Sequence, residues 1–94
     1  MAEKLFTLDA DIRSDDPGAI APVLEARFAR EAITRLPDGF KVLGVISGES
    51  AQDLNRALLS DLRRAVRKTR LRATWSDGDV TERFFDYVRK GRLG

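Results

Sequence analysis

The spacing of apolar residues alternates along this chain between the period of a strand and the period of a helix. This alternation restricts the possible folds more than any other feature of the sequence. In residues 5–12, apolar side chains alternate with polar ones, at Phe6, Leu8, Ala10 and Ile12. A period of two is typical of a strand that buries one face. We therefore expect a half-exposed strand here, with an acidic outer face.

The next segment is predicted to be helical after a turn at residues 13–18. Apolar residues recur at every fourth position, at Leu24, Phe28, Ala32 and Leu36. The helix begins either after a cap at Asp16 or near Ala21, because Pro22 is unfavourable inside a helix. We expect its body at residues 23–36, ended by the Pro-Asp-Gly sequence that follows.

Residues 40–46 form a nearly continuous apolar run between turn residues, which predicts a buried central strand. Residues 51–69 carry the clearest helical pattern, a stripe made of Leu54, Leu58, Leu62, Ala65, Val66 and Thr69. Residues 71–75 alternate again, which predicts a third strand.

Residues 80–90 fit two structures. Asp77-Gly78 is a strong hairpin signal, which favours a strand after it. However, both faces of such a strand mix charged and apolar residues. At helical spacing the apolar residues fall in one arc, made of Val80, Phe84, Phe85, Tyr87 and Val88. We therefore predict a third helix.

The predicted order is β-α-β-α-β-α over a single domain, residues 1–94. Strands that alternate with helices indicate an α/β fold with a parallel sheet and right-handed crossovers. We expect a small α/β domain whose three-stranded, mainly parallel sheet is packed by helices.

The composition excludes several kinds of chemistry. The 94 residues include no Cys and no His, so disulfides, thiolate nucleophiles, Ser-His-Asp triads and His metal ligands are absent. No glycine-rich phosphate loop follows any predicted strand. We expect no enzyme activity and no cofactor. Without a long apolar run or a leader sequence, we also expect no membrane partner and a cytoplasmic location.

Acidic residues gather in the predicted loops. A parallel sheet would bring residues 13–18, 47–50 and 76–79 to one edge. Asp15 or Asp16 with Glu49 or Asp77 could then hold a divalent cation, and Asp9 with Asp11 could do so on a strand. Because the spacing matches no known metal loop, we interpret these acids as helix caps and solvated surface. No metal site is predicted.

A basic cluster is the most distinctive feature. Residues 1–47 carry 6 basic and 8 acidic groups, whereas residues 48–94 carry 11 and 7. The cluster lies at the end of the second predicted helix and consists of Arg63, Arg64, Arg67, Lys68 and Arg70. It is a solvated helix end, a polyanion-binding face or a docking site for an acidic protein surface.

Three functions remain open. We rank first a non-catalytic interaction or regulatory module that contacts another protein or a second copy of itself. The alternative is a nucleic-acid-binding domain that uses the arginine-rich outer face of the second helix. The third is a metal-dependent enzyme that uses the acids at positions 9, 11, 15 and 16.

Overall fold

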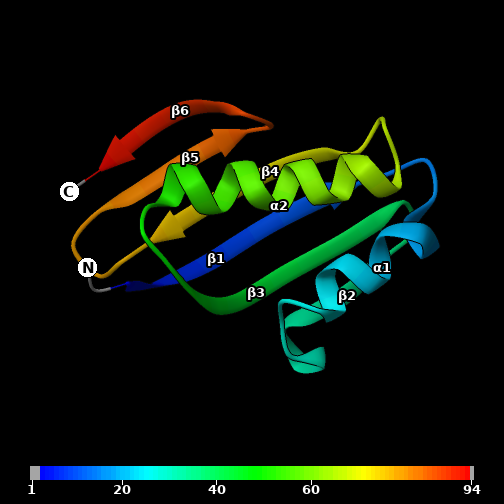
Figure 1. Cartoon of the computed structure of the whole chain (residues 1–94), viewed down its shortest axis with the longest axis horizontal. Coiled ribbons are helices and arrows are strands. Elements are labelled where there is room, and N and C mark those ends of the chain that lie inside the picture. The colour runs from blue at the N-terminus through cyan, green and yellow to red at the C-terminus, as the bar shows by residue number, and fades with distance from the viewer. Residues whose placement is uncertain (1–2, 94) are drawn as a thin grey trace.

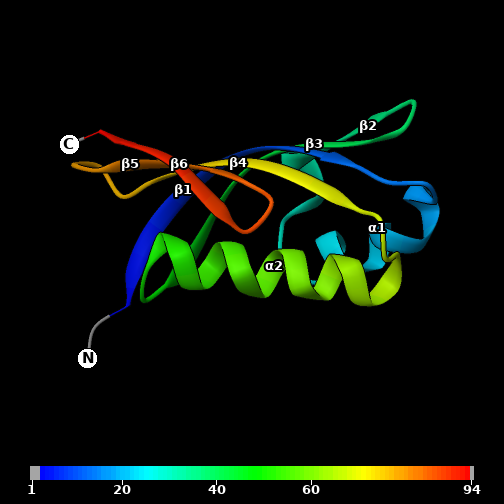
Figure 2. The ribbon, with the colours of Figure 1, turned by 90° about the horizontal axis from the view of Figure 1, so that it is seen from above.

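The computed structural model describes residues 3–93 and shows a six-stranded antiparallel sheet with both helices on one face (Figures 1 and 2). The elements in chain order are β1 (Lys4–Arg13), α1 (Pro17–Glu25), the 3₁₀ helix η1 (Arg30–Ala32), β2 (Ile33–Leu36), β3 (Gly39–Gly48), α2 (Ala51–Ala65), β4 (Arg70–Ser76), β5 (Thr81–Phe85) and β6 (Val88–Leu93).

The sheet order is β2-β3-β1-β4-β5-β6, and every neighbouring pair is antiparallel. The predicted three-stranded parallel sheet of an α/β domain is therefore wrong. An additional strand, β2, reverses the chain before β3, so β3 runs against β1 instead of along it. Up to β4, the connectivity is that of the ferredoxin-like β-α-β-β-α-β motif, and β5 and β6 extend the sheet.

The helix predicted for residues 23–36 is also wrong. The helix α1 occupies residues 17–25 with Pro22 inside it, and β2 then pairs with β3 across a two-residue turn. Leu36 pairs with Gly39, whose missing side chain leaves room for the carbonyl of Ile12. The backbone of residues 33–36 gains sheet partners in β3, and this pairing outweighs the fourfold spacing of apolar residues.

The third predicted helix, at residues 80–90, is replaced by the β5–β6 hairpin. Asp77-Gly78 forms the turn before it, and Gly78 has a φ of 101° that favours glycine. The faces of β5 look mixed in the sequence because this edge of the sheet extends beyond the helices (Figure 1). Only Phe84 of β5 is buried in the core.

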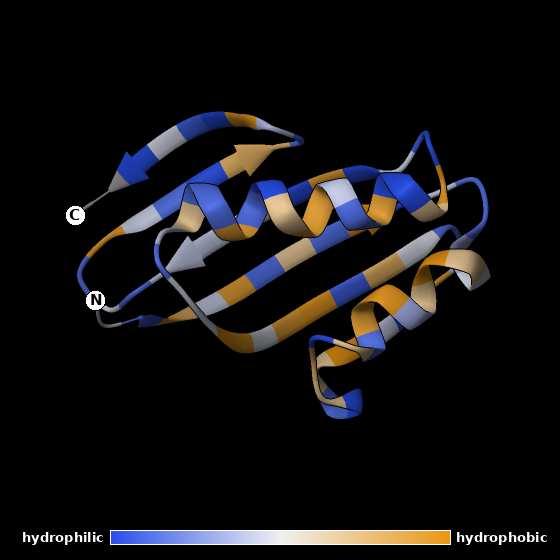
Figure 3. Cartoon of the chain, in the orientation of Figure 1, coloured by the Kyte–Doolittle hydropathy of each residue, from blue (hydrophilic) through white to orange (hydrophobic). Residues whose placement is uncertain are grey.

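The predicted strands at residues 5–12, 40–46 and 71–75 all form, and so does the second helix. Ser50 caps α2 by accepting a hydrogen bond from the Asp53 amide at 3.1 Å, and the helix ends at Ala65, four residues earlier than predicted. The core lies between the helices and the sheet. Hydropathy alternates along β1 (Figure 3), where Phe6, Leu8, Ala10 and Ile12 are buried.

Candidate functional site

The sheet face opposite the helices is left uncovered by the described residues, 3–93 (Figure 2). We call it the open face. On β1 the buried residues alternate with exposed or half-buried ones, so the odd-numbered side chains of this strand point to the open face. The register then assigns neighbours from β3 and β4 to the same face.

Among residues 3–92, five large apolar side chains are exposed on the open face. Leu5, Leu43 and Val45 have exposed fractions of 69%, 58% and 60%. Phe85 and Val88, paired between β5 and β6, are exposed to 39% and 56%. A concentration of apolar surface on one uncovered face marks a site of contact with another molecule.

An acidic row, Asp9 and Asp11, runs along β1 in the middle of the open face. The Lys41 Nζ atom on β3 lies 3.2 Å from Asp9 Oδ1 and 3.7 Å from Asp11 Oδ2. The hydrogen bond to Asp9 and the charge of Asp11 raise the pKa of the Lys41 amine above its ordinary value. On the other side, Arg72 of β4 lies directly opposite Asp11.

Basic side chains occupy the other half of the open face. They come from the end of β1, from β4 and from β5, and are Arg13, Arg70, Arg72 and Arg83. The Arg72 guanidinium lies over the Phe85 ring, 5.0 Å from its centroid. The open face therefore places an acidic row beside a basic region, with apolar residues on both sides.

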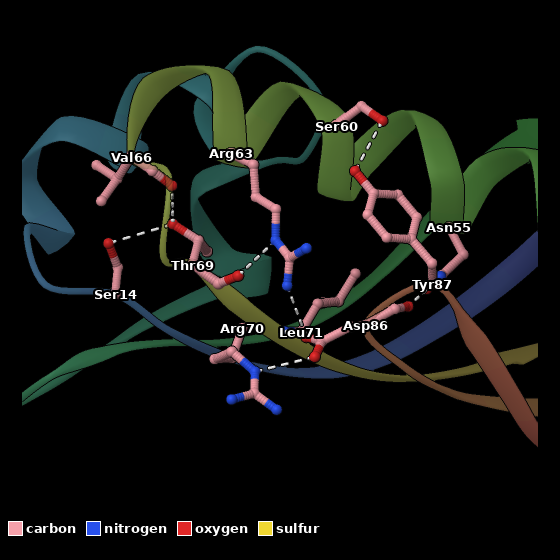
Figure 4. Close-up of polar contacts among 10 residues, drawn as sticks. All are labelled: Ser14, Asn55, Ser60, Arg63, Val66, Thr69, Arg70, Leu71, Asp86 and Tyr87. Atoms are coloured by element: carbon pink, nitrogen blue, oxygen red, sulfur yellow. Dashed lines mark hydrogen bonds and ion pairs between the residues drawn. The ribbon is translucent and has the colours of Figure 1, made fainter.

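Asp86 fixes the β5–β6 turn against the end of this face (Figure 4). Its carboxylate accepts hydrogen bonds from Arg70 Nε and from the Leu71 amide, both at 2.9 Å. Its own amide donates to the Leu71 carbonyl at 2.6 Å. Its φ of 56° lies in the left-handed region, which Asp tolerates better than most residues.

Helix α2 contacts the same turn through three side chains. Arg63 lies 3.5 Å from Asp86 Oδ1 and 5.2 Å from the centroid of the Tyr87 ring. The hydroxyl groups of Ser60 and Tyr87 are 3.2 Å apart. The buried Asn55 donates to the Asp86 carbonyl at 2.7 Å and accepts from the Trp75 indole at 3.1 Å. The hairpin tip is therefore tied to the helix layer.

The five basic residues singled out in the sequence do not share one surface. Arg63 turns inward and donates to the Thr69 carbonyl, whereas Arg64 pairs with Asp61. Arg67 and Lys68 lie exposed in the turn after α2. Arg70 lies on β4 and points to the open face. The structure brings only Arg63 and Arg70 together, through Asp86.

The acidic loops expected at one edge are separated by the antiparallel sheet. The register pairs Arg13 with Gly39 and Lys4 with Gly48, so residues 13–18 and 47–50 lie at opposite ends. Residues 76–79 lie at the same end as residues 47–50, because Ser76 pairs with Thr7. Within residues 3–93, no three acidic side chains gather closely enough to hold a metal ion. The Asp77 carboxylate instead accepts from the Val80 and Asp79 amides in its own turn. The first of these bonds is the main reason that the pKa of Asp77 is lowered.

The residues that sequence reasoning missed are those of the open face, above all Leu43, Val45 and Arg72. The apolar run at residues 40–46 suggested burial on both faces, but β3 buries only alternate positions. The one available signal was the period of two in β4, which separates Arg70 and Arg72 from the buried Leu71.

The chain was compared with known proteins at three levels. No protein-family model matches it, and neither the curated proteins nor the solved structures contain a significant match. No helix within residues 3–93 is long and apolar enough to cross a membrane. The fold thus defines a two-layer α+β protein with one open sheet face.

Proposed function

We propose that this chain is a non-catalytic interaction module that pairs with a second copy of itself through the open face. The observation that carries this proposal is the concentration of exposed apolar side chains there. Of the six large apolar residues that are exposed within residues 3–92, five lie on the open face, and the sixth, Tyr87, lies at the hairpin tip beside it. Burial of this surface would stabilise the pair.

The open face is large enough for a specific interface. The six strands are about 4.8 Å apart, and the sheet is about 25 Å long. Its flat area is therefore about 600 Å² per copy, without the additional surface of the side chains. Specific complexes bury about 600–1,000 Å² per partner, so this area lies at the lower end of that range. A second copy supplies a surface of matching size, and two sheets that pack face to face form the familiar layered arrangement.

Charge complementarity favours a second copy as the occupant. A two-fold axis parallel to the strands, between β1 and β4, stacks β1 of one copy on β4 of the other and β3 on β5. Because the axis preserves the position along the strands, Asp11 then faces the Arg72 of the second copy. On the neighbouring strands, Leu43 then lies over Arg83, Val45 over Thr81 and Lys41 over Phe85 of the second copy. The like charges Arg13 and Arg70 lie at the strand ends, where an angle of about 30° between packed sheets separates them.

The nucleic-acid alternative has less support on the helix surface where the sequence suggested it. Arg63 contacts Asp86, and Arg64 contacts Asp61, which reduces the unpaired charge along α2. The exposed Arg67 and Lys68 remain as a short basic turn. Binding of oligonucleotides by this turn, lost in Arg67→Glu/Lys68→Glu, would favour that function instead.

The test is sedimentation equilibrium of the purified chain over a wide concentration range. We expect the mass to rise from 10.5 kDa toward twice that value as concentration increases. The variant Leu43→Glu/Val45→Glu buries two charges in the proposed interface, so it should remain at 10.5 kDa. The control Gln52→Glu/Ala57→Glu adds the same charge to exposed positions of α2 and should behave like the unchanged chain.

Two results would contradict the proposal. One is a chain that stays monomeric at the highest concentration reached. The other is self-association that the two substitutions on β3 and the two on α2 weaken equally, since the contact would then not use the open face. Circular dichroism of all variants confirms that they remain folded.

A further inference from the structure

A groove of about 440 Å³ lies at the end of the open face, where β1 ends and β4 begins. Three arginines from these strands line it, Arg13, Arg70 and Arg72. The rest of the lining comes from Asp11, Leu71, Phe85 and Asp86. Its volume lies within the range of about 300–1,000 Å³ that is common for small-molecule sites.

Two arginines of this groove face each other across neighbouring strands, an arrangement that a bound anion would stabilise. Arg13 lies directly opposite Arg70 in the β1–β4 register. Two like charges opposite each other on adjacent strands destabilise the pair. Each contacts a carboxylate in a neighbouring turn, and Arg13 also lies 3.9 Å from Asp11 on its own strand. Arg13 contacts Asp38 in the β2–β3 turn, and Arg70 contacts Asp86 in the β5–β6 turn.

The groove has many more donors than its own carboxylates can use. Each guanidinium carries five N–H groups. Arg70 commits its Nε–H to Asp86, and Arg13 commits one nitrogen to Asp38. Arg72 stacks on Phe85 and has no carboxylate within 4.0 Å among residues 3–93. Three neighbouring guanidinium groups with free donors match the several acceptor oxygens of a phosphate.

Asp86 and Asp11 do not cancel this charge, because each is shared with a cation outside the groove. Asp86 also contacts Arg63, and Asp11 also contacts Lys41. These contacts join four cations to four carboxylates, and Arg72, which forms no such contact, raises the number of cations to five. The cations are Arg13, Lys41, Arg63, Arg70 and Arg72, and the carboxylates are Asp9, Asp11, Asp38 and Asp86.

We propose that this groove binds a nucleotide, with its phosphate between Arg13 and Arg70 and its base against Arg72 and Phe85. An aromatic ring and a guanidinium plane are the surfaces on which proteins stack bases. Phe85 is 39% exposed, so its side chain is accessible from the groove. The nucleotide comes either as a free nucleoside phosphate or as one unit of a single-stranded nucleic acid.

The groove is formed by a single chain, so this inference goes beyond the proposed function and does not require pairing of two copies. Because Arg13, Arg70 and Arg72 also lie in the proposed interface, pairing covers the groove and competes with the nucleotide. The variant Leu43→Glu/Val45→Glu separates the two, because both of its substitutions lie on β3, outside the groove lining. If this variant is monomeric and still binds the nucleotide, the two proposals stand independently.

Isothermal titration calorimetry at low salt tests the inference with four probes: adenosine monophosphate, adenosine, inorganic phosphate and a six-residue single-stranded oligoadenylate. We expect saturable binding of the monophosphate, at one site per chain. Adenosine and phosphate should each bind at least about tenfold more weakly, because each lacks half of the contacts. Oligoadenylate that binds at least about tenfold more tightly than the monophosphate indicates a strand, and equal affinity indicates a free nucleotide.

The groove variant is compared with a control variant that removes the same number of positive charges elsewhere. Arg13→Gln/Arg70→Gln should lower the affinity for the monophosphate at least about tenfold, because charge-assisted hydrogen bonds to the phosphate are lost. The control Arg64→Gln/Arg67→Gln removes two charges from the end of α2 and should change the affinity less than about twofold. Arg72→Gln breaks no ion pair among residues 3–93, so it reports on the groove even if the double variant unfolds.

Three results would overturn the inference. The first is that neither the monophosphate nor the oligoadenylate shows saturable binding at low salt. The second is an equal loss of affinity in the groove variants and in the control, which would indicate a general effect of charge. The third is inorganic phosphate that binds as tightly as the monophosphate, which would exclude a role for the base.

Discussion

Asp86 shows how one residue can determine an edge of the sheet. Its carboxylate satisfies the Leu71 amide and pairs with Arg70, while its backbone adopts a left-handed conformation. Asp86→Ala removes both hydrogen bonds and places a less suitable residue at this φ. We expect a loss of about 2–4 kcal/mol in the free energy of unfolding, measured by urea denaturation.

Two further variants separate the causes of this loss. Asp86→Asn keeps an acceptor oxygen and tolerates the left-handed conformation, so it should cost about 1 kcal/mol. Asp79→Ala removes a carboxylate of the neighbouring turn that accepts no hydrogen bond within residues 3–93, so it should change stability by less than about 0.5 kcal/mol. Equal losses in Asp86→Ala and Asp79→Ala would contradict this role of Asp86.

Asn55 is the buried polar residue that connects the helix layer to the hairpin. Its amide joins the Trp75 indole to the Asp86 carbonyl. Asn55→Ala leaves the buried indole N–H without its acceptor, so we expect a loss of about 2–3 kcal/mol in the free energy of unfolding. Trp75→Phe removes the same hydrogen bond from the other side. A double-mutant cycle should therefore show a coupling of about 0.5 kcal/mol or more, and additive losses would rule out the connection.

At the scale of elements, the β4–β5 turn depends on an ionised carboxylate. The Val80 amide, and to a lesser extent the Asp79 amide and Lys4, lower the pKa of Asp77 below its ordinary value of 3.8. A carboxyl with a lowered native pKa contributes stability above its unfolded pKa, and this contribution is lost as the pH falls through the native value. The unchanged chain should therefore exceed Asp77→Asn in stability at pH 6, and the difference should disappear on acidification. A difference that stays constant down to pH 2 would contradict this pKa shift.

The elements that the sequence predicts well are those whose pattern reflects one local environment. Helix α2 and strand β1 each bury one face in the same core. Their apolar residues therefore keep the regular spacing that is typical of a helix and of a strand. Residues 33–36 fail because their structure depends on pairing with β3, a tertiary contact without a local pattern. Residues 81–93 fail because the sheet extends past the helices and their faces are only partly buried. The hairpin that Asp77-Gly78 favours does form, although the mixed faces of the strand after it favour a helix.

The candidate site on the open face could not be predicted from the sequence, because it also depends on contacts between distant segments. The arginines of β4 and those of α2 are close in the sequence and therefore look like one cluster. The chain reverses its direction between the two elements, so the arginines of β4 and α2 lie on different surfaces. Arg13 joins Arg70 only through the β1–β4 register, which no local pattern predicts. Composition alone indicated a basic second half, and the structure assigns part of that charge to the open face.

At the scale of the whole molecule, the proposed pair depends on the order of charges across six strands. In the unchanged chain Asp11 and Arg72 are neighbours in one sheet, and in the proposed pair each also faces its opposite in the second copy. Asp11→Arg gives a chain with two positive groups in this row, and Arg72→Asp gives one with two negative groups. Each variant alone should therefore pair at least about tenfold more weakly than the unchanged chain, because like charges face each other.

Mixing the two variants provides the decisive comparison. Across the interface, the two positive groups of the Asp11→Arg chain meet the two negative groups of the Arg72→Asp chain, although each chain keeps its unfavourable internal pair. We expect the mixture to associate at least about tenfold more tightly than either variant alone, and raising the salt from 0.05 M to 0.5 M should reduce this gain. Sedimentation of the mixture measures both effects. A mixture that associates no better than its components would show that these two rows do not face each other, and the proposed two-fold axis would then be wrong.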